Sequence, residues 1–513
     1  MSETVNRIVR NGATSYVSMV VASACGFIMV PITLRYLGKE EYGLLVLVGA
    51  LAGYVSLSGL GIGTAIMRSV AEARSASSPR DLSPTISTAF FFYLLISLLG
   101  LAASVLLIHP LPYFFQVPPD KVGLSQVLLL ISFTGAWATF PLSVQTGVLV
   151  GRERFDLMNL LQTAQAIVWL LAGVLVLWNG GRLIAFLAAR TATSLLFALA
   201  GAWLAHRELP SLRLSPRMIR LSELRHLLSF GLFIYCIHVA VHITQQADAV
   251  VIGVFLPLET IAVYNIGLRL SEIAREIPAQ LGRLLPPVIV RLDQHTQPDE
   301  LRTAFEESTK WILAVALAAA TPLIAFAHPL IGAWVGDGFS RAALVVYILC
   351  VGGIVSIGQS PASYILMFKG RHKLAAGLAL SEGVLNLILS IILIRAFDIV
   401  GVALGTTIPI FIMHTLVNVP MACRLIDMPV HRLLRGAVLP ALAPAIVTLA
   451  LAVAVQQYVG VDHLLPTLLG MAATAAVYVL LFARASLSSG DRARYLLYLR
   501  GAVRYALSAG GRS

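Results

Sequence analysis

Charged side chains are scarce throughout this sequence. Only 12% of the 513 residues are Asp, Glu, Lys or Arg, whereas 58% are hydrophobic, and the mean hydropathy is +0.85. An ordinary soluble domain carries roughly 25% charged residues. Because the deficit extends along the whole chain, it excludes a large soluble catalytic domain and predicts that most of the chain lies in a lipid bilayer.

The sequence also lacks paired cysteines and a nucleotide-binding loop. Its four cysteines, Cys25, Cys236, Cys350 and Cys423, lie singly, without the spacing of a disulfide framework or a metal site. No Gly-x-x-x-x-Gly-Lys-Ser/Thr motif occurs, which excludes a nucleotide-driven pump of the phosphate-loop type. We therefore predict no metal, no cofactor and no enzymatic activity.

What the sequence does contain is a series of long apolar runs. A bilayer core about 30 Å thick needs around 20 apolar residues per helix. Arg7 and Arg10 precede the first run, but that run is too long for a signal peptide, so we expect an uncleaved helix. The runs predict an all-α integral membrane protein with about fourteen transmembrane helices, near 12–34, 43–67, 85–108, 123–149, 157–178, 183–205, 227–253, 261–290, 311–335, 342–368, 374–395, 399–423, 436–458 and 464–484.

Lys and Arg fall mainly in loops on one side of these helices. With a cytoplasmic amino terminus, the outer loops hold only Arg35, Lys39, Lys121, Arg182, Arg341 and Arg395 of the 37. This asymmetry predicts that both termini are cytoplasmic. The net charge of +12 then reflects topology and attraction to anionic lipid, with no nucleic-acid site implied. In the basic tail 486–513, we expect 491–504 to lie as an amphipathic helix on the inner membrane face.

The two halves of the chain contain similar motifs at corresponding positions. Pro141 precedes the turn Gly151-Arg152, and Pro361 precedes Gly370-Arg371. Two bundles of the same orientation with a substrate path between them are a common transporter plan. We therefore predict an N-terminal six-helix bundle (1–205), a cytoplasmic linker (206–226), a C-terminal six-helix bundle (227–425) and two additional helices (426–485).

The predicted span 261–290 carries a polar stripe. At 100° per residue, one face of this helix presents Asn265, Arg269, Glu272, Glu276, Gln280 and Arg283, with Arg275 nearby. Each Arg or Glu facing lipid near the midplane would cost roughly 2.5–3.5 kcal/mol, so the stripe must face water or protein. Two interpretations stay open. The charges pair internally at i,i+3, or the arginines bind the oxygens of a diphosphate in a wet cavity.

Other spans contribute further candidates. His238, His242 and Gln245 share one face of span 227–253 and are candidates to line a cavity for sugar hydroxyls, as is Asn265 in the next span. Arg68, at the cytoplasmic end of its span, is a candidate for first contact with a phosphate. The candidates for proton or sodium coupling are Asp248, Glu272 and Glu276, with ordinary ion pairing as the alternative. Arg190 either snorkels or pairs.

Several short motifs occur in a characteristic order. In the first half they are Pro31, Arg35-Tyr36-Leu37-Gly38, Tyr42-Gly43, Gly59-Leu60-Gly61 and Arg68, and in the second half Asp248 through Gly253, Tyr264, Glu382, Asn386, Gly401, Gly405 and Thr406. From about residue 5 to about 425 the chain resembles polysaccharide and oligosaccharide flippases, in the superfamily that also holds multidrug extruders and lipid II flippases. Ser58 stands where members often have an acidic residue, so ion coupling at that position is in doubt.

The resemblance implies a function that composition does not show. It implies translocation of a polyprenyl-diphosphate-linked oligosaccharide across a bacterial inner membrane by alternating access, for cell-surface polysaccharides such as O-antigen, lipopolysaccharide or exopolysaccharide. Glycan polymerases or glycosyltransferases would be the implied partners.

Two other functions predict different features of the sequence. A multidrug extruder of the same superfamily predicts twelve spans and a more aromatic cavity. A membrane glycan polymerase or ligase predicts a large outer loop, whereas the longest outer loop here, 109–122, is short and holds only Asp120 and Lys121 as charges.

Overall fold

The computed structural model describes residues 2–75, 81–282, 298–458 and 463–486. Within these ranges all regular secondary structure is helical, and no β-strand occurs. The all-α membrane fold predicted from the sequence is therefore confirmed. Segment 491–504, predicted as an amphipathic helix, and most of the tail 486–513 lie outside the described residues.

Ten helical segments of the described chain are long and apolar enough to cross a membrane. Two of them, Thr14–Gly59 and His372–Leu425, each overlap two of the predicted runs, and run 43–67 continues into α2 (Ile62–Ser75). Gly38, with φ of 79°, bends the first, and Asp398, with φ of 52°, bends the second. The remaining two predicted runs coincide with α9 (Leu221–Phe255) and, as far as it is described, α10 (Leu258–Gly282).

Contacts among the helices divide the chain into two compact units. Unit 1 comprises residues 1–267 and 373–409, and unit 2 comprises 268–372 and 410–513. Two long helices, α10 and α15 (His372–Phe411), contribute to both units. The functional division into bundles 1–205 and 227–425 stays a prediction.

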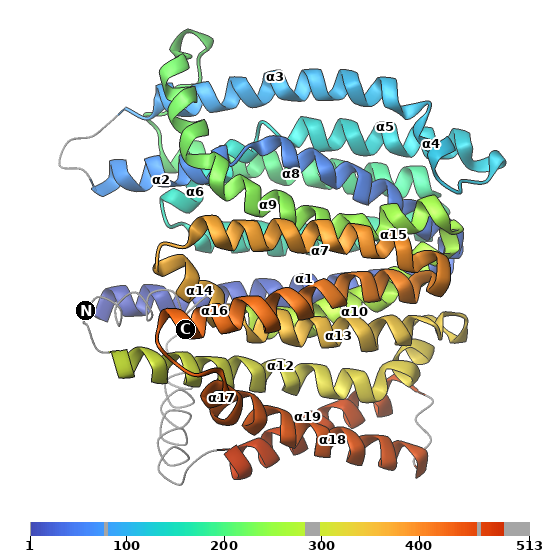
Figure 1. The fold of residues 1–513 in the computed structure, drawn as a ribbon. Helices are drawn as coiled ribbons and strands as arrows, with labels where there is room; N and C mark the ends of the chain where they lie inside the picture. The colour runs from blue at the N-terminus through green and yellow to red at the C-terminus, as the bar shows by residue number, and fades with distance from the viewer. Residues whose placement is uncertain (1, 76–80, 283–297, 459–462, 487–513) are drawn as a thin grey trace, which may run out of the picture. The chain divides into compact units, whose positions relative to one another are not determined.

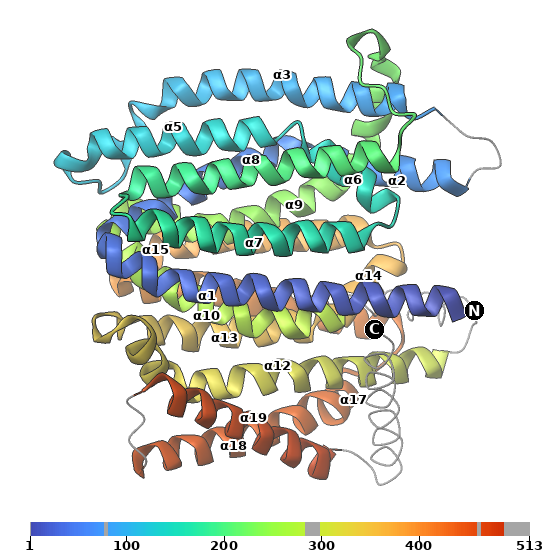
Figure 2. The same ribbon diagram turned by 180° about the vertical axis from the view of Figure 1, so that it is seen from behind.

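Unit 1 holds most of the first half of the chain. Its other elements are α1 (Ser2–Gly53), η1 (Tyr54–Gly59), α2 (Ile62–Ser75), α3 (Ser83–Ile108), α4 (Leu111–Phe114), η2 (Pro119–Lys121), α5 (Val122–Thr139), α6 (Ser143–Gly151), α7 (Phe155–Trp178), α8 (Leu183–Glu208) and η3 (Pro216–Met218). Within it, α3 packs on α5, α5 on α8, and α8 on α7 (Figures 1 and 2). The helix α1 packs in turn against α7 and α5.

Unit 2 is organised around one long helix, α12 (Pro298–Val335). It packs against α13 (Ala342–Gly358), α18 (Leu439–Tyr458) and α19 (Leu464–Ser486), as the yellow-to-red ribbon shows (Figures 1 and 2). Leu313 and Leu317 meet Tyr478 and Phe482 in its core. The shorter elements are η4 (Asp337–Phe339), α14 (Ser360–Phe368), the π-helix η5 (Ile412–Asn418), α16 (Val419–Leu425), α17 (Val430–Leu433) and the π-helix η6 (Leu434–Val438).

The repeated prolines break a helix in both units. Pro141 lies in the turn between α5 and α6, and Pro361 is the second residue of α14, directly after the break that follows α13. Proline has no N–H and clashes with the preceding helical turn, which favours a break at these two positions, although Pro31 and Pro409 lie inside helices. The predicted spans 123–149 and 342–368 are therefore each divided near their proline.

Two motif glycines let the arms of α15 touch. A Cβ on Gly401 would lie 2.2 Å from the carbonyl oxygen of Leu393, and one on Gly405 would lie 2.4 Å from Ser390 Oγ and 2.6 Å from its backbone nitrogen. Small residues allow such close backbone approach between membrane helices. Gly401 and Gly405 are therefore structural residues of the hairpin.

We expect Gly405→Val to destabilise the protein by about 1–3 kcal/mol or more, because the added methyl groups would overlap backbone that cannot move aside. The measurement is the melting temperature of the purified protein in detergent. Gly377→Val is the matched control on the same helix, since a Cβ at Gly377 meets nothing within 4 Å. Equal melting temperatures for the two variants would contradict the packing of this hairpin.

The linker 206–226 is fixed to α3. Ser83 Oγ accepts from the backbone N–H of Arg213 at 3.2 Å, and Ser87 Oγ donates to the Arg213 carbonyl at 3.0 Å. Thr88 Oγ1 accepts from the N–H of Arg220 at 3.0 Å. Because α3 supplies this row of hydroxyls, the linker backbone runs along it as an ordered strap.

Candidate functional site

The charged residues predicted on one face of α10 are accessible. Arg269 forms an ion pair with Glu272 at 2.9 Å, and their side chains are 57% and 30% exposed. Glu276 is exposed, whereas Arg275 is half-buried with its Cδ beside Gly353. An exposed i,i+3 pair contributes only about 0.2–1 kcal/mol. The pairing at i,i+3 is therefore present at Arg269 but weak, and a substrate contact by this residue stays a prediction.

Arg68 lies in a similar setting on α2. It is 54% exposed and forms an i,i+4 ion pair with Glu72 at 2.6 Å. Arg283, the third arginine of the predicted stripe, lies outside the described residues. The described candidates for phosphate contact are thus Arg68, Arg269 and Arg275.

The polar face predicted along α9 is described in part. His242 Nε2 lies 3.2 Å from Ser56 Oγ of η1. Gln246, one turn further on, packs against Gly53, where a Cβ would lie 3.2 Å from Gln246 Cδ. The side chains of His238 and Gln245 lie outside the described part of the structure. His242 and Gln246 therefore face η1 and the end of α1.

Asn265 is buried where α1 meets α10. Its amide oxygen accepts a hydrogen bond of 2.9 Å from the Tyr42 hydroxyl. The next residue, Gly43, allows the close approach, since a Cβ there would lie 1.9 Å from the Leu258 carbonyl oxygen. Tyr42, Gly43 and Asn265 thus hold these helices together, and a substrate contact by Asn265 stays a prediction.

Asp248 anchors a buried polar network in unit 1. Its side chain is 4% exposed and accepts a hydrogen bond from the Tyr264 hydroxyl. Thr406 Oγ1 lies 3.3 and 3.4 Å from the two carboxylate oxygens and accepts from Asn386 Nδ2 at 2.8 Å. The four residues Asp248, Tyr264, Asn386 and Thr406 are called the Asp248 network below. No ion pair to Asp248 occurs within the described ranges, so hydroxyl groups are what solvate its carboxylate.

Oxygen atoms beside this network lack partners. Asn386 Oδ1 and Ser390 Oγ are buried on α15 without a hydrogen-bond partner among the described residues. Thr406 Oγ1 also lies 3.2 Å from the Val402 carbonyl, and its single proton cannot serve both that oxygen and Asp248. Buried oxygens are normally satisfied. A carboxylate with neighbouring oxygen acceptors matches the ligands that a hard cation prefers.

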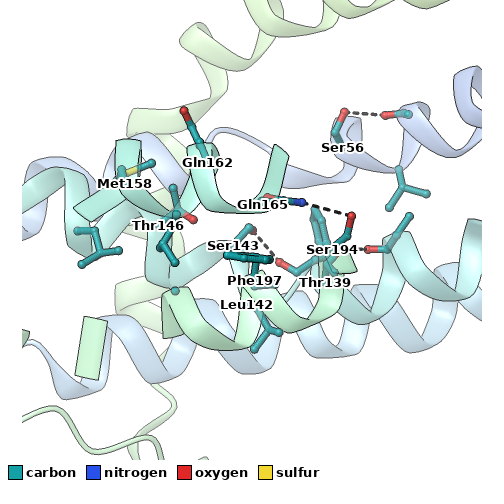
Figure 3. Close-up of a pocket in the computed structure, with 18 of the residues that line it drawn as sticks. Ser56, Thr139, Leu142, Ser143, Thr146, Met158, Gln162, Gln165, Ser194 and Phe197 are labelled. Atoms are coloured by element: carbon teal, nitrogen blue, oxygen red, sulfur yellow. Dashed lines mark hydrogen bonds between the residues drawn. The ribbon is translucent and has the colours of Figure 1, made fainter. Parts of the chain in front are cut away.

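Unit 1 also contains a cavity of about 480 Å³ between η1, α5, α6, α7 and α8 (Figure 3). Its polar lining residues are Ser56, Thr139, Ser143, Thr146, Gln162, Gln165 and Ser194. No lining residue within the described ranges is ionisable. The lining of this space, called the unit 1 cavity, is mainly apolar with uncharged polar groups set into it, and its size is that of a small-molecule site.

The cavity offers both donors and acceptors. Ser56 Oγ donates to the Gly53 carbonyl at 2.7 Å, and Ser143 Oγ to the Phe140 carbonyl at 2.6 Å, which leaves their oxygen lone pairs as acceptors. Gln165 Nε2 donates to Ser194 Oγ at a longer 3.4 Å (Figure 3). Glutamine amides both donate and accept, as sugar hydroxyls do. The lining is thus suited to a polyhydroxylated, uncharged group.

Arg190 on α8 stacks on Trp169 of α7. Its Cζ lies 5.8 Å from the ring centroid, and the Trp169 ring packs edge-on against Phe186 with centroids 4.7 Å apart. An arginine within a membrane span costs roughly 2.5–3.5 kcal/mol on insertion scales. A cation–π contact offsets about 0.5–2 kcal/mol of this insertion cost. From the sequence, Arg190 either snorkels or pairs. In the structure its guanidinium stacks on Trp169.

None of the predicted substrate contacts whose side chains the structure describes lines the unit 1 cavity. The sequence signal was Gln162 and Gln165 within an otherwise apolar run, with Ser194 in the next span. Uncharged polar residues cost less in a membrane span than charged ones do, so their pattern is a weaker signal. Only the packing of α7 on α8 shows that they share one space.

Two comparisons with known proteins agree with the flippase resemblance seen in the sequence motifs. The family model described as polysaccharide biosynthesis protein matches residues 8–293. The chain is similar to a probable low-salt glycan biosynthesis flippase, Agl15 of Haloferax volcanii, with 26% identity over 166 residues. That alignment spans 31% of this chain and 34% of the relative, about a third of its length.

Solved structures show a shared fold. The lipid II flippase MurJ in an inward closed conformation superposes with a TM-score of 0.72 at 14% identity, covering 93% of this chain and 99% of MurJ. An inward-facing multidrug resistance MATE transporter gives 0.65 at 14% identity, covering 80% and 94%. A MOP superfamily transporter from Pyrococcus furiosus gives 0.57 at 14% identity, covering 82% and 95%. At these identities the likeness concerns the fold alone.

The described helices and the fold likeness show a multi-pass membrane protein of the MurJ and MATE type. The resemblance inferred from the sequence motifs is confirmed, because the matching family model covers more than half of the chain. The chain belongs to the polysaccharide biosynthesis protein family.

Proposed function

We propose that this protein is a flippase for a polyprenyl-diphosphate-linked oligosaccharide. It moves the lipid from the cytoplasmic to the outer leaflet of a bacterial inner membrane by alternating access, with both of its own termini cytoplasmic. The product feeds the synthesis of a cell-surface polysaccharide of the O-antigen, lipopolysaccharide or exopolysaccharide kind. Glycosyltransferases supply the lipid-linked glycan, and a glycan polymerase consumes it.

The observation that carries this proposal is the unit 1 cavity in a chain of this family. A glycan cannot cross the hydrocarbon core unless its hydroxyls keep hydrogen-bonding partners, because each unsatisfied polar group costs several kcal/mol. Gln162, Gln165 and Ser194 provide such partners within membrane-spanning helices. The absence of charge from the described lining favours sugar hydroxyls over a cationic drug.

The diphosphate group requires a different surface. Guanidinium groups bind phosphate oxygens in bidentate fashion. Arg68 and Arg269 are exposed, and each forms an ion pair on its own helix, with Glu72 and Glu272, so a headgroup that reaches them would compete with these pairs. Arg275 and Arg283 extend the same stripe in the sequence.

The Asp248 network is the proposed site of ion coupling. A buried carboxylate is costly unless a proton or a cation compensates it. Asp248 has hydroxyl donors, and unpartnered oxygens of Asn386 and Ser390 lie on the adjoining helix α15. Glu272, which pairs with Arg269, and the exposed Glu276 are weaker coupling candidates because neither is buried.

A multidrug extruder is the second candidate within the same fold. Several solved structures of that class share the fold, but the matching family model is that of polysaccharide biosynthesis. A membrane polymerase or ligase is disfavoured, because the relatives named above are flippases and transporters.

The proposal is tested in vesicles that contain the purified protein. A fluorescent polyprenyl-diphosphate-linked trisaccharide in the outer leaflet is quenched by a membrane-impermeant reductant, so the protected fraction reports movement between leaflets. We expect the protein to raise the rate of exchange at least tenfold above protein-free vesicles. A rate equal to that of protein-free vesicles, combined with export of a cationic dye, would establish the extruder instead.

A further inference from the structure

Trp169 and Arg190 lie one helical turn beyond Gln165 and Ser194, which line the unit 1 cavity. On α7, Trp169 comes four residues after Gln165, and on α8, Arg190 comes four residues before Ser194. Residues four apart occupy the same helix face, one turn from each other. Because Gln165 is hydrogen-bonded to Ser194 across the two helices, the stacked pair lies one turn beyond that bond.

The pair is held at membrane depth. The helix α7 ends at Trp178 and α8 begins at Leu183. At a rise of 1.5 Å per residue, Trp169 and Arg190 lie roughly 10–14 Å from those ends. The guanidinium is 5.8 Å from the ring centroid, so it stays level with the indole and does not extend to the helix ends. Its side chain is exposed, so the rest of the described protein does not cover it.

We propose that Trp169 and Arg190 form a subsite for a sugar that carries an oxyanion, a carboxylate or a phosphate. An indole combines a flat apolar face with low conformational freedom, which suits the apolar C–H face of a sugar ring. The planar guanidinium binds carboxylate or phosphate oxygens in bidentate fashion. This inference rests on the proposed function. It adds that the sugar accepted by the unit 1 cavity carries a negative charge.

The arrangement explains why uncharged polar groups line the cavity while the positive charge lies one turn beyond them. The described lining of the cavity is uncharged and offers partners to hydroxyl groups, whereas the positive charge of Arg190 stands one turn further along α8. A neutral sugar would use the first part alone. An acidic sugar would use both, and the protein would favour it.

The first test measures binding to the full-length protein in detergent by isothermal titration calorimetry. The probes are methyl glucuronide, methyl glucoside 6-phosphate and neutral methyl glucoside. We expect one or both anionic probes to bind at least tenfold more tightly than the neutral probe, and Arg190→Gln to remove this difference. The probe that responds identifies the oxyanion as carboxylate or phosphate.

Arg207→Gln is the matched control, because Arg207 stacks on Trp203 of the same helix with Cζ 5.6 Å from the ring centroid, away from the cavity lining. It should bind all three probes as the wild type does. Trp169→Leu should weaken all three, since it removes the stacking surface. Melting temperatures without ligand show whether each variant is folded. Unchanged discrimination in a folded Arg190→Gln protein would overturn the inference.

The second test separates this inference from the proposed function. Vesicle transport is measured with a lipid-linked trisaccharide that contains glucuronic acid and with the same trisaccharide containing glucose. We expect Arg190→Gln to slow the acidic substrate at least tenfold and the neutral one less than twofold. Equal slowing of both substrates would overturn the subsite and leave the flippase intact. Failure of the wild-type protein to move either substrate would overturn the flippase, and the binding test would then judge the subsite alone.

Discussion

Asp248→Asn should make transport of the lipid-linked trisaccharide insensitive to an ion gradient. The carboxylate is buried, is solvated by Tyr264 and Thr406, and has no ion pair within the described residues. Asparagine keeps the shape and an acceptor oxygen but cannot balance a cation or bind a proton. Because interactions with an ionised group contribute about 1.5–3 kcal/mol, the gradient-driven rate should fall about 10- to 100-fold.

The measurement compares vesicles with an inward or outward gradient of sodium or of protons. Whichever gradient accelerates the wild-type protein should not accelerate Asp248→Asn. Thr406→Val removes one oxygen but keeps the carboxylate, so we expect a smaller, several-fold loss. Asp120→Asn, in an exposed turn outside the long helices, is the control and should behave as wild type. Full acceleration of a folded Asp248→Asn protein would remove this residue from the coupling mechanism.

Arg269→Ala should lower the transport rate of both the acidic and the neutral trisaccharide lipid about 10- to 100-fold. The two substrates share the diphosphate, and a charge-assisted bidentate contact is worth roughly 1.5–3 kcal/mol. Arg269 is more than half exposed, so its removal should not unfold the protein. Arg269→Lys should recover part of the rate, because lysine keeps the charge and loses the planar fork.

Glu272→Gln distinguishes ligand binding from internal pairing. If Arg269 binds the diphosphate, loss of its i,i+3 partner should change the transport rate less than twofold, since exposed pairs contribute about 0.2–1 kcal/mol. If Arg269 acts only by pairing with Glu272, the two substitutions should cause equal losses. Equal losses would therefore remove Arg269 from substrate binding.

The helices were predictable because membrane insertion leaves a strong signal in a single sequence. Runs such as 85–108 and 183–205 coincide with α3 and α8 within a few residues, since about 20 apolar residues are needed to cross a bilayer whatever they pack against. The breaks at Pro141 and Pro361 follow from the missing N–H of proline. Other prolines of the described chain, such as Pro31 and Pro409, lie inside helices, so the sequence alone does not show which prolines break a helix.

Only the charged residues of the candidate site were predictable from the sequence. Asp248, Arg68 and Arg269 stand out because ionised groups are costly in a membrane. Arg269 is exposed and pairs with Glu272 at i,i+3, and substrate binding by it stays a prediction. The interpretation of Asn265 as a substrate contact did not foresee its bond to Tyr42, because the two residues are far apart in the sequence.

Composition and spacing were enough to establish a multi-pass helical membrane protein and its family, because hydrophobicity, proline and glycine act locally along the chain. Which polar side chains meet was decided only by tertiary packing. Thr406 approaches Asp248 because glycines let the arms of α15 close, and Gln165 meets Ser194 because α7 packs on α8. Such contacts depend on the depth and rotation of each helix, and a hydropathy pattern specifies neither to the accuracy of a hydrogen bond.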